Sequence, residues 1–308
     1  MINVEHLTKY YGQKLAVDDI SFTVTKGEVV GFLGPNGAGK STTMNMITGC
    51  LSSTSGQCRI DGIDIIENPN EAKKLIGFLP EQPPLYYDMN PREYLNFIYD
   101  LKKCTLNRRE HINEIVDVMG LGEMQYRLIG QLSKGFKQRV GIAGALVSNP
   151  PIMIFDEPTI GLDPRQIIEI RDLIRTLGSD HTIILSTHIL PEVQAVCGRI
   201  LIIDRGKLIA DQKTDEINSL AEDNRKFTVR IVGSKNEVLN FLRKTEGAAK
   251  VDYLSSSKDG SSLFMVQCKK GYDLRKTLFY ALAEKRWPII EMATVGASLE
   301  DIFIAMTK

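Results

Sequence analysis

The sequence predicts an α/β fold organised around a phosphate-binding loop, followed by a small α+β domain. Three observations lead to this prediction. A glycine-rich loop over residues 34–42 lies between an apolar segment, 28–33, typical of a buried strand, and a segment, 42–47, that begins a helix. Several further short apolar runs end in polar or acidic residues, as the strands of a buried sheet do. From residue 216 onward the pattern changes to the order β-α-β-β-α-β.

The glycine-rich loop fits the phosphate-binding pattern G-x-x-x-x-G-K-[ST]. Its residues are Gly34, Pro35, Asn36, Gly37, Ala38, Gly39, Lys40, Ser41 and Thr42. Glycines let backbone N–H groups turn inward around phosphate oxygens, and the following helix N-terminus adds partial positive charge. In this pattern Lys40 reaches the outer phosphates and the Ser41 hydroxyl coordinates Mg²⁺. The alternative is a glycine-rich turn without a ligand, but the flanking strand and helix favour nucleotide binding.

The composition is that of a soluble globular protein of two domains. The chain has 308 residues, of which 43% are apolar and 25% charged. Basic and acidic residues number 38 each, so we expect no nucleic-acid partner, which would favour a basic surplus. The five cysteines are scattered, which argues against a disulfide framework or a zinc site and favours a reducing compartment.

The first residues show no signal-peptide pattern, and no apolar run approaches the roughly 18 residues of a membrane span. We therefore expect a cytoplasmic protein whose contact with a membrane is made only through a partner.

Residues 1–33 alternate apolar and polar positions and predict antiparallel strands. Tyr11 lies between two of these strands. Its ring could stack on a flat base or fill the core, and the sequence leaves both possibilities open.

Residues 76–82 predict a buried strand that ends at Gln82, where α/β sheets bind ligands. The side-chain carbonyl of Gln82 could join a Mg²⁺ shell, or the amide could cap the loop. Helical patterns that begin after Asn90 and Asn107 then indicate a helical insert over about 83–150. Within it, Ser133 and Gly135 begin a helix whose N-terminus is either a second anion site or an ordinary cap.

Two carboxylates follow the next buried strand. Asp156 is placed to hold Mg²⁺ through water, and Glu157 to orient or deprotonate an attacking water. The alternative is a solvated loop, but adjacent buried acids are costly unless a cation or water uses them. A further strand, 182–187, ends at His188, which can hydrogen-bond a γ-phosphate. The remaining histidines are assigned to surfaces: His6, His111 and His181.

These motifs, in this order, resemble the nucleotide-binding subunit of ATP-binding-cassette (ABC) transporters over residues 1 to about 215. The stretch 132–138 takes the place of the family's signature, Leu-Ser-Gly-Gly-Gln. Lys134 replaces a glycine there and Phe136 replaces the glutamine, whereas Ser133 and Gly135 remain. The sequence Ser-Lys-Gly-aromatic is similar to that of ABC-2-type exporter ATPases of the drug-resistance and gliding-motility kinds.

The resemblance implies an ABC cassette with a mixed-sheet core, an antiparallel β subdomain and a helical subdomain. It also implies a head-to-tail dimer that encloses two ATP molecules with Mg²⁺. Each ATP would contact the phosphate loop of one subunit and Ser133 and Gly135 of the other. Tyr11 would stack on adenine and Gln82 would join Ser41 on the metal. Asp156 would support Mg²⁺, Glu157 would act on the water and His188 would sense the γ-phosphate.

The C-terminal domain, 216–308, matches a ferredoxin-like module and includes a last helix capped at Ser298. Similar tails occur in the same exporter group. We expect a regulatory or dimer-bracing role, with small-ligand sensing as the alternative.

Together these features predict the ATPase subunit of an exporter, working with a separate transmembrane permease at the inner face of the membrane. One alternative is a soluble ABC-type ATPase that acts on ribosomes or DNA, although the chain has one cassette and no basic surplus. Another is a non-catalytic nucleotide-binding module, against which Glu157 argues.

Overall fold

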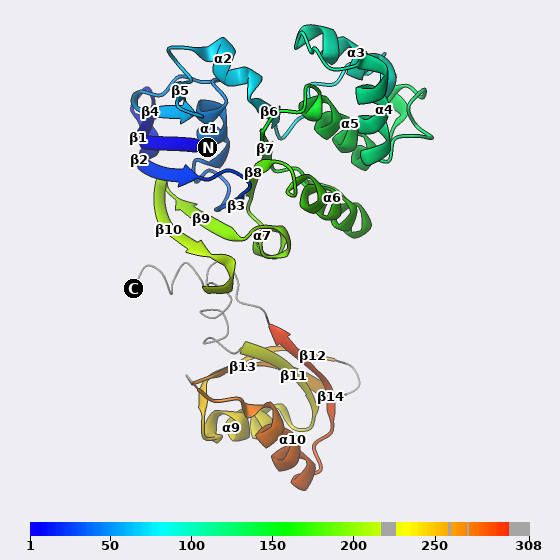
Figure 1. Ribbon diagram of the computed structural model, residues 1–308. Helices are drawn as coiled ribbons and strands as arrows, with labels where there is room; N and C mark the ends of the chain where they lie inside the picture. The colour runs from blue at the N-terminus through cyan, green and yellow to red at the C-terminus, as the bar shows by residue number, and fades with distance from the viewer. Residues whose placement is uncertain (217–225, 258–259, 270, 296–308) are drawn as a thin grey trace. The chain divides into compact units, whose positions relative to one another are not determined.

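The computed structural model divides the chain into two compact units, Met1–Thr214 and Asp215–Lys308 (Figure 1). The first unit ends one residue before the boundary expected from the sequence. The structure describes residues 1–216, 226–257, 260–269 and 271–295. Each unit has its own hydrophobic core and is described by itself.

A mixed sheet of six strands forms the centre of the first unit, in the order β10-β9-β3-β8-β7-β6. Its strands are β3 (Val29–Leu33), β6 (Ile76–Leu79), β7 (Ile152–Asp156), β8 (Thr182–Thr187), β9 (Arg199–Asp204) and β10 (Lys207–Lys213). Only β10 runs antiparallel to its neighbour. Every residue of β7 and β8 is buried, which explains their continuous apolar sequences.

An antiparallel sheet lies beside the mixed sheet in the order β2-β1-β4-β5. Its strands are β1 (Ile2–Tyr11), β2 (Lys14–Val24), β4 (Ser55–Ile60) and β5 (Ile63–Asp64). Helix α1 (Lys40–Ile47) contributes Met44, Met46 and Ile47 to a core that includes buried residues of both sheets (Figure 1). This packing fixes the start of α1, and with it the glycine-rich loop, at the carboxyl end of β3.

Helices make up most of the segment between β6 and β7, as predicted. They are α3 (Pro91–Leu101), α4 (Arg108–Val118), the short 3₁₀ helix η1 (Ile129–Gln131) and α5 (Lys134–Leu146). Another helix, α2 (Pro69–Lys74), comes before β6. Asn90 and Glu93 form a reciprocal capping box on α3. Asn107 stands at the N-cap of α4, but its side chain makes no capping hydrogen bond.

Helix α6 (Pro164–Leu177) begins after Asp163, whose carboxylate accepts the N–H groups of Arg165 and Gln166. Helix α7 (Leu190–Val196) follows β8 and contacts β3 and β8. Both helices therefore start near the ends of strands that carry the predicted site residues.

Two of the three histidines assigned to surfaces are buried, so that prediction was wrong for them. His111 is 7% exposed and accepts the N–H of Ser148 at Nε2, and His181 lies with Nδ1 2.8 Å from the carbonyl oxygen of Pro150. Each satisfies a backbone group at the turn before β7, a role that sequence pattern alone does not reveal. His6 is exposed, as expected.

The second unit is a four-stranded antiparallel sheet in the order β12-β13-β11-β14. Its elements are β11 (Lys226–Val232), α9 (Lys235–Lys244), β12 (Ala248–Ser256), β13 (Ser261–Cys268), α10 (Leu274–Glu284) and β14 (Ile289–Val295). Val238 of α9 and Leu278 of α10 pack in one core with β11 and β13. This is the ferredoxin-like arrangement predicted; the helix expected after Ser298 lies outside the described residues.

Candidate functional site

Three neighbouring parallel strands bring the predicted site residues together at their carboxyl ends. Leu33 of β3 pairs with Thr187 of β8, and Asp156 of β7 pairs with Ser186 of β8. The glycine-rich loop follows β3, Glu157 follows β7 and His188 follows β8. Ligands of open α/β sheets bind at this edge.

The glycines of the loop are required by close backbone approaches. A Cβ atom at Gly34 would lie 2.3 Å from the carbonyl oxygen of Ile203, and one at Gly39 would lie 2.6 Å from that of Ala16. Gly39 also adopts a φ of 111°, in the left-handed region. Any side chain at these positions would push the loop away from the sheet, so the loop depends on glycine for its shape.

Lys40 is 5% exposed, which is unusual for a lysine. Its Nζ donates to the carbonyl oxygens of Gly34 and Pro35 at 2.9 and 3.2 Å and lies 3.1 Å from Oε1 of Glu157. The loop carbonyl oxygens thus hold the ammonium group beside the carboxylate of Glu157. An anionic ligand of this cation would take the place of one of these three contacts.

The two acids have different surroundings. Asp156 is 3% exposed and accepts the hydroxyl of Ser186 at 2.7 Å. Glu157 is 5% exposed and adopts a φ of 50°. Its Oε2 atom lies 2.9 Å from Nδ1 of His188. Because left-handed backbone is costly for a non-glycine residue, its presence at this carboxylate is typical of a functional position.

The carboxylate of Glu157 is therefore placed between a cation and an imidazole. A water held there would face a general base, which is the chemistry that hydrolysis of a phosphoanhydride needs.

A pocket of about 480 Å³ opens over the loop, within the size range of cofactor sites. The loop residues Asn36, Gly37, Gly39, Lys40, Ser41 and Thr42 line it. Tyr11 lines it too and is 49% exposed, so its ring is available for stacking and does not fill the core. Six further lining residues were not predicted from the sequence: Lys14, Leu15, Ala16, Glu81, Ile160 and Arg205.

Residues 14–16 begin β2. The other three follow a strand end or a site motif: Glu81 comes just after β6, Ile160 after Glu157, and Arg205 after β9. A place shortly after the carboxyl end of a strand is the sequence pattern that could have identified these three residues. Gln82 is exposed and does not line the pocket.

Ser133 and Gly135 do not join the phosphate loop within the chain. They line a separate small pocket with Phe136, Arg139 and Gln166. Ser133 is the N-cap of α5 and accepts the N–H of Phe136. Ser133 thus caps α5, as the sequence indicated, and neither Ser133 nor Gly135 lines the pocket over the phosphate loop of the same chain.

Among the residues that the structure describes, no cluster of three or more His, Cys, Asp or Glu side chains could hold a metal. Mg²⁺ does not require such a cluster, because it commonly uses one or two protein oxygens together with phosphates and waters. The half-buried Ser41 hydroxyl beside the loop and the buried carboxylate of Asp156 fit this pattern. In the part of the chain that the structure describes, no helix is long and apolar enough to cross a membrane.

Comparisons with known proteins show relatives over most of the chain. Residues 17–160 match the family described as ABC transporter. The bacitracin transport ATP-binding protein of Bacillus licheniformis is 37% identical over 246 residues, which cover 79% of this chain and 79% of that protein. The chain belongs to the ATP-binding proteins of ABC transporters. An uncharacterized ABC transporter ATP-binding protein of Bacillus subtilis (strain 168) is 34% identical over 100% of this chain and 96% of its own length.

A solved dimeric ATP-binding cassette, in a post-hydrolysis state with bound ADP and Pi, is 28% identical to this ABC protein. Its TM-score is 0.63, and the match covers 70% of this chain and 99% of that one. The predicted cassette fold and the prediction of an ATPase are thereby confirmed. The chain binds and hydrolyses ATP as a transporter subunit, and the alternatives of a ribosome- or DNA-acting ATPase and of a non-catalytic module find no support.

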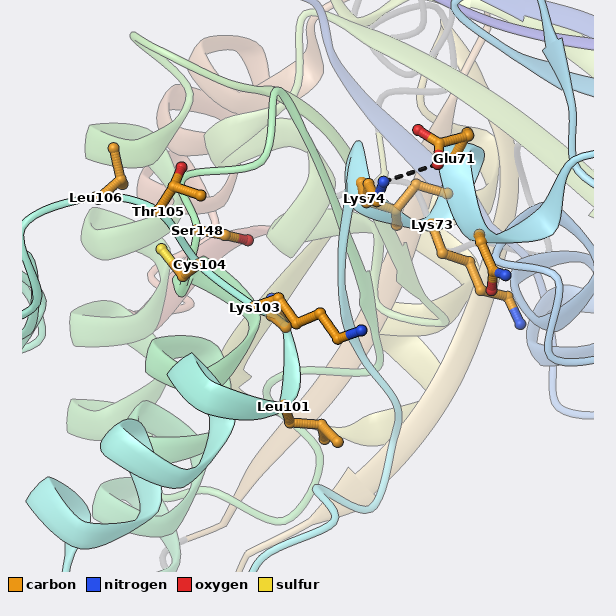
Figure 2. A pocket seen from close by; sticks show the side chains of 12 residues that line it. Glu71, Lys73, Lys74, Leu101, Lys103, Cys104, Thr105, Leu106 and Ser148 are labelled. Atoms are coloured by element: carbon orange, nitrogen blue, oxygen red, sulfur yellow. Dashed lines mark hydrogen bonds and ion pairs between the residues drawn. The ribbon is translucent and has the colours of Figure 1, made fainter.

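A different pocket of this ABC ATPase, of about 820 Å³, lies between α2 and the end of α3 with the residues that follow it (Figure 2). Four lysines line it, at positions 73, 74, 102 and 103. Lys74 pairs with Glu71, and Nζ of Lys102 donates to the carbonyl oxygens of Ala145 and Val147 at 2.9 and 2.8 Å. Burial lowers the pKa of Lys102 to about 8. This pocket shares no lining residue with the pocket over the phosphate loop.

Proposed function

We propose that this ATPase powers export across a membrane through a separate transmembrane permease, attached peripherally at the membrane's inner face. The observation that carries the proposal is the division of the site. The chain builds a complete phosphate loop with Glu157 and His188 beside it, but it presents Ser133 and Gly135 in a different pocket. Because the two anion-binding parts are separated within one chain, a second copy of the chain can supply the part that each nucleotide site lacks.

The dimer of this proposal is head to tail, with two ATP molecules at the interface. Each triphosphate contacts Lys40 of one subunit and the α5 N-terminus, at Ser133 and Gly135, of the other. The free N–H groups and the dipole of that helix end favour phosphate oxygens. Binding closes the dimer and hydrolysis opens it, and this two-state element is what moves the permease.

Within each site, Tyr11 stacks on adenine and residues 34–42 cradle the phosphates. Ser41 and Asp156 hold Mg²⁺, which would neutralise charge between the outer phosphates. Gln82 is proposed as a further metal contact, supported by its place just after β6; its exposed side chain would have to turn inward. Glu157 accepts a proton from the attacking water, and His188 contacts the γ-phosphate.

The second unit carries a regulatory or dimer-bracing role in this proposal. Its support is that the unit has a core of its own and that the relative from Bacillus subtilis matches the whole chain.

Recovery from membranes tests the transporter assignment. We expect the tagged protein, expressed in its own cell, to sediment with membranes and to co-purify in detergent with a protein of several membrane spans. The same tag on an unrelated cytoplasmic protein of similar charge is the control. Recovery with ribosomes alone, and with no membrane protein, would overturn the assignment while leaving the ATPase activity in place.

A further inference from the structure

Glu192 is a charged side chain inside the first unit that the described site does not use. It lies in the first turn of α7 and is 1% exposed. Burial of an ionised carboxylate costs several kcal/mol unless hydrogen bonds or nearby charges compensate it. The helix N-terminus contributes some compensation, and the remaining partners of Glu192 are side chains from two other segments.

Two threonine hydroxyls hold the carboxylate. The hydroxyl of Thr159 lies 2.8 and 2.7 Å from the two carboxylate oxygens, and that of Thr187 lies 2.8 Å from Oε2. The Thr187 hydroxyl also accepts the N–H of Ile189 at 3.1 Å, so its own proton is directed at Glu192. The exposed fractions of Thr159 and Thr187 are 5% and 0%, so the bridge is shielded from bulk solvent.

The two threonines belong to the segments that carry the reactive side chains. Thr159 stands two residues after Glu157 in the loop that leads to α6, and Thr187 immediately precedes His188. Oε2 of Glu157 and Nδ1 of His188 are 2.9 Å apart. Glu192 is therefore a bridge between the same two segments.

We propose that Glu192 is a positioning residue for ATP hydrolysis, which fixes the Glu157 carboxylate relative to the His188 imidazole through Thr159 and Thr187. The inference rests on the proposed roles of Glu157 and His188. Without the bridge, the N–H of Glu157 still donates to the carbonyl oxygen of Ser186 at 3.0 Å, but the segment 158–163 loses its side-chain contact with α7. A displacement of about 1 Å at a catalytic group can cost up to 10²-fold in rate.

A glutamine weakens this bridge. Its amide oxygen can still accept from the threonine hydroxyls, but the negative charge that strengthens these hydrogen bonds is lost. We expect Glu192→Gln to lower kcat for ATP by about tenfold, with KM for ATP within twofold of the wild type. Nucleotide affinity is preserved because neither Glu192 nor its threonine partners line the nucleotide pocket.

A double-mutant cycle with Thr159→Val tests the route of the effect. Because the threonine acts through the same bridge, Thr159→Val should also lower kcat, and the double variant should lose no more than Glu192→Gln alone. Glu110→Gln, on the exposed side of α4, is the matched control and should keep wild-type kcat. Thr159→Val changes no charge and keeps the test available if Glu192→Gln folds poorly.

Wild-type kcat in both Glu192→Gln and Thr159→Val would overturn the inference, as would multiplicative losses in the double variant. A loss of ATP affinity and melting temperature in parallel with kcat would assign Glu192 a merely structural role and would also overturn it. Failure of the role proposed for Glu157 has a different signature, which is undiminished turnover in Glu157→Gln, and failure of the transporter assignment would show as recovery away from membranes.

Discussion

Glu157→Gln is expected to lower ATP turnover by roughly 10²–10⁴-fold, the range that removal of a general base produces. The amide keeps the size of the side chain and can still accept a hydrogen bond from Lys40, which lies 3.1 Å from Oε1. It cannot take a proton from water. ATP binding should therefore stay within a few-fold of the wild type, and both quantities can be measured by phosphate release and by fluorescent-nucleotide titration.

Asp163→Asn serves as the control for a nearby acid. Asp163 caps α6 through its carboxylate oxygen, and an asparagine can cap equally well. Turnover in this control should remain within a few-fold of the wild type. Hydrolysis at the wild-type rate in Glu157→Gln would refute the role assigned to the carboxylate.

Lys40→Met is expected to weaken ATP binding by roughly 10–100-fold, as the loss of charge-assisted hydrogen bonds worth about 1.5–3 kcal/mol predicts. Turnover should fall by more than that. The substitution removes the cation from the phosphate loop and leaves Glu157 buried without its partner at 3.1 Å. The variant should therefore also unfold at a lower temperature than the wild type.

The double variant Lys40→Met/Glu157→Gln separates the two effects. Neutralising Glu157 should restore the melting temperature, because no unpaired carboxylate remains, whereas ATP binding should stay weak. If the single variant binds ATP as tightly as the wild type, the phosphate loop is not the nucleotide site.

The residues of the phosphate loop and the two acids could be found in the sequence because their spacing along the chain is itself the signal. Gly34 and Gly39 sit where another backbone carbonyl approaches, and only glycine fits such positions. Asp156 and Glu157 end an apolar run, which marks the buried edge of a sheet. The ferredoxin-like order of the second unit was equally readable, because its helices and strands alternate with clear periodicity.

Contacts made by residues far apart in the chain could not be predicted in this way. Glu192 and Thr159 are 33 residues apart, and nothing in the local pattern at either one indicates a buried hydrogen bond. His111 and His181 lie in polar surroundings in the sequence, but the fold turns both toward the carbonyl and N–H groups around Pro150 and Ser148. Arg205 reaches the pocket only because β9 lies next to β3.

The central claim is that two copies of the chain share each ATP. Sedimentation of Glu157→Gln with and without Mg-ATP tests it most directly, because hydrolysis is blocked and the closed state accumulates. The account predicts a mass near 34.4 kDa without nucleotide and about twice that with Mg-ATP, and no increase for Lys40→Met/Glu157→Gln. A protein that binds ATP at saturating concentration and still sediments at the mass of one chain would contradict it.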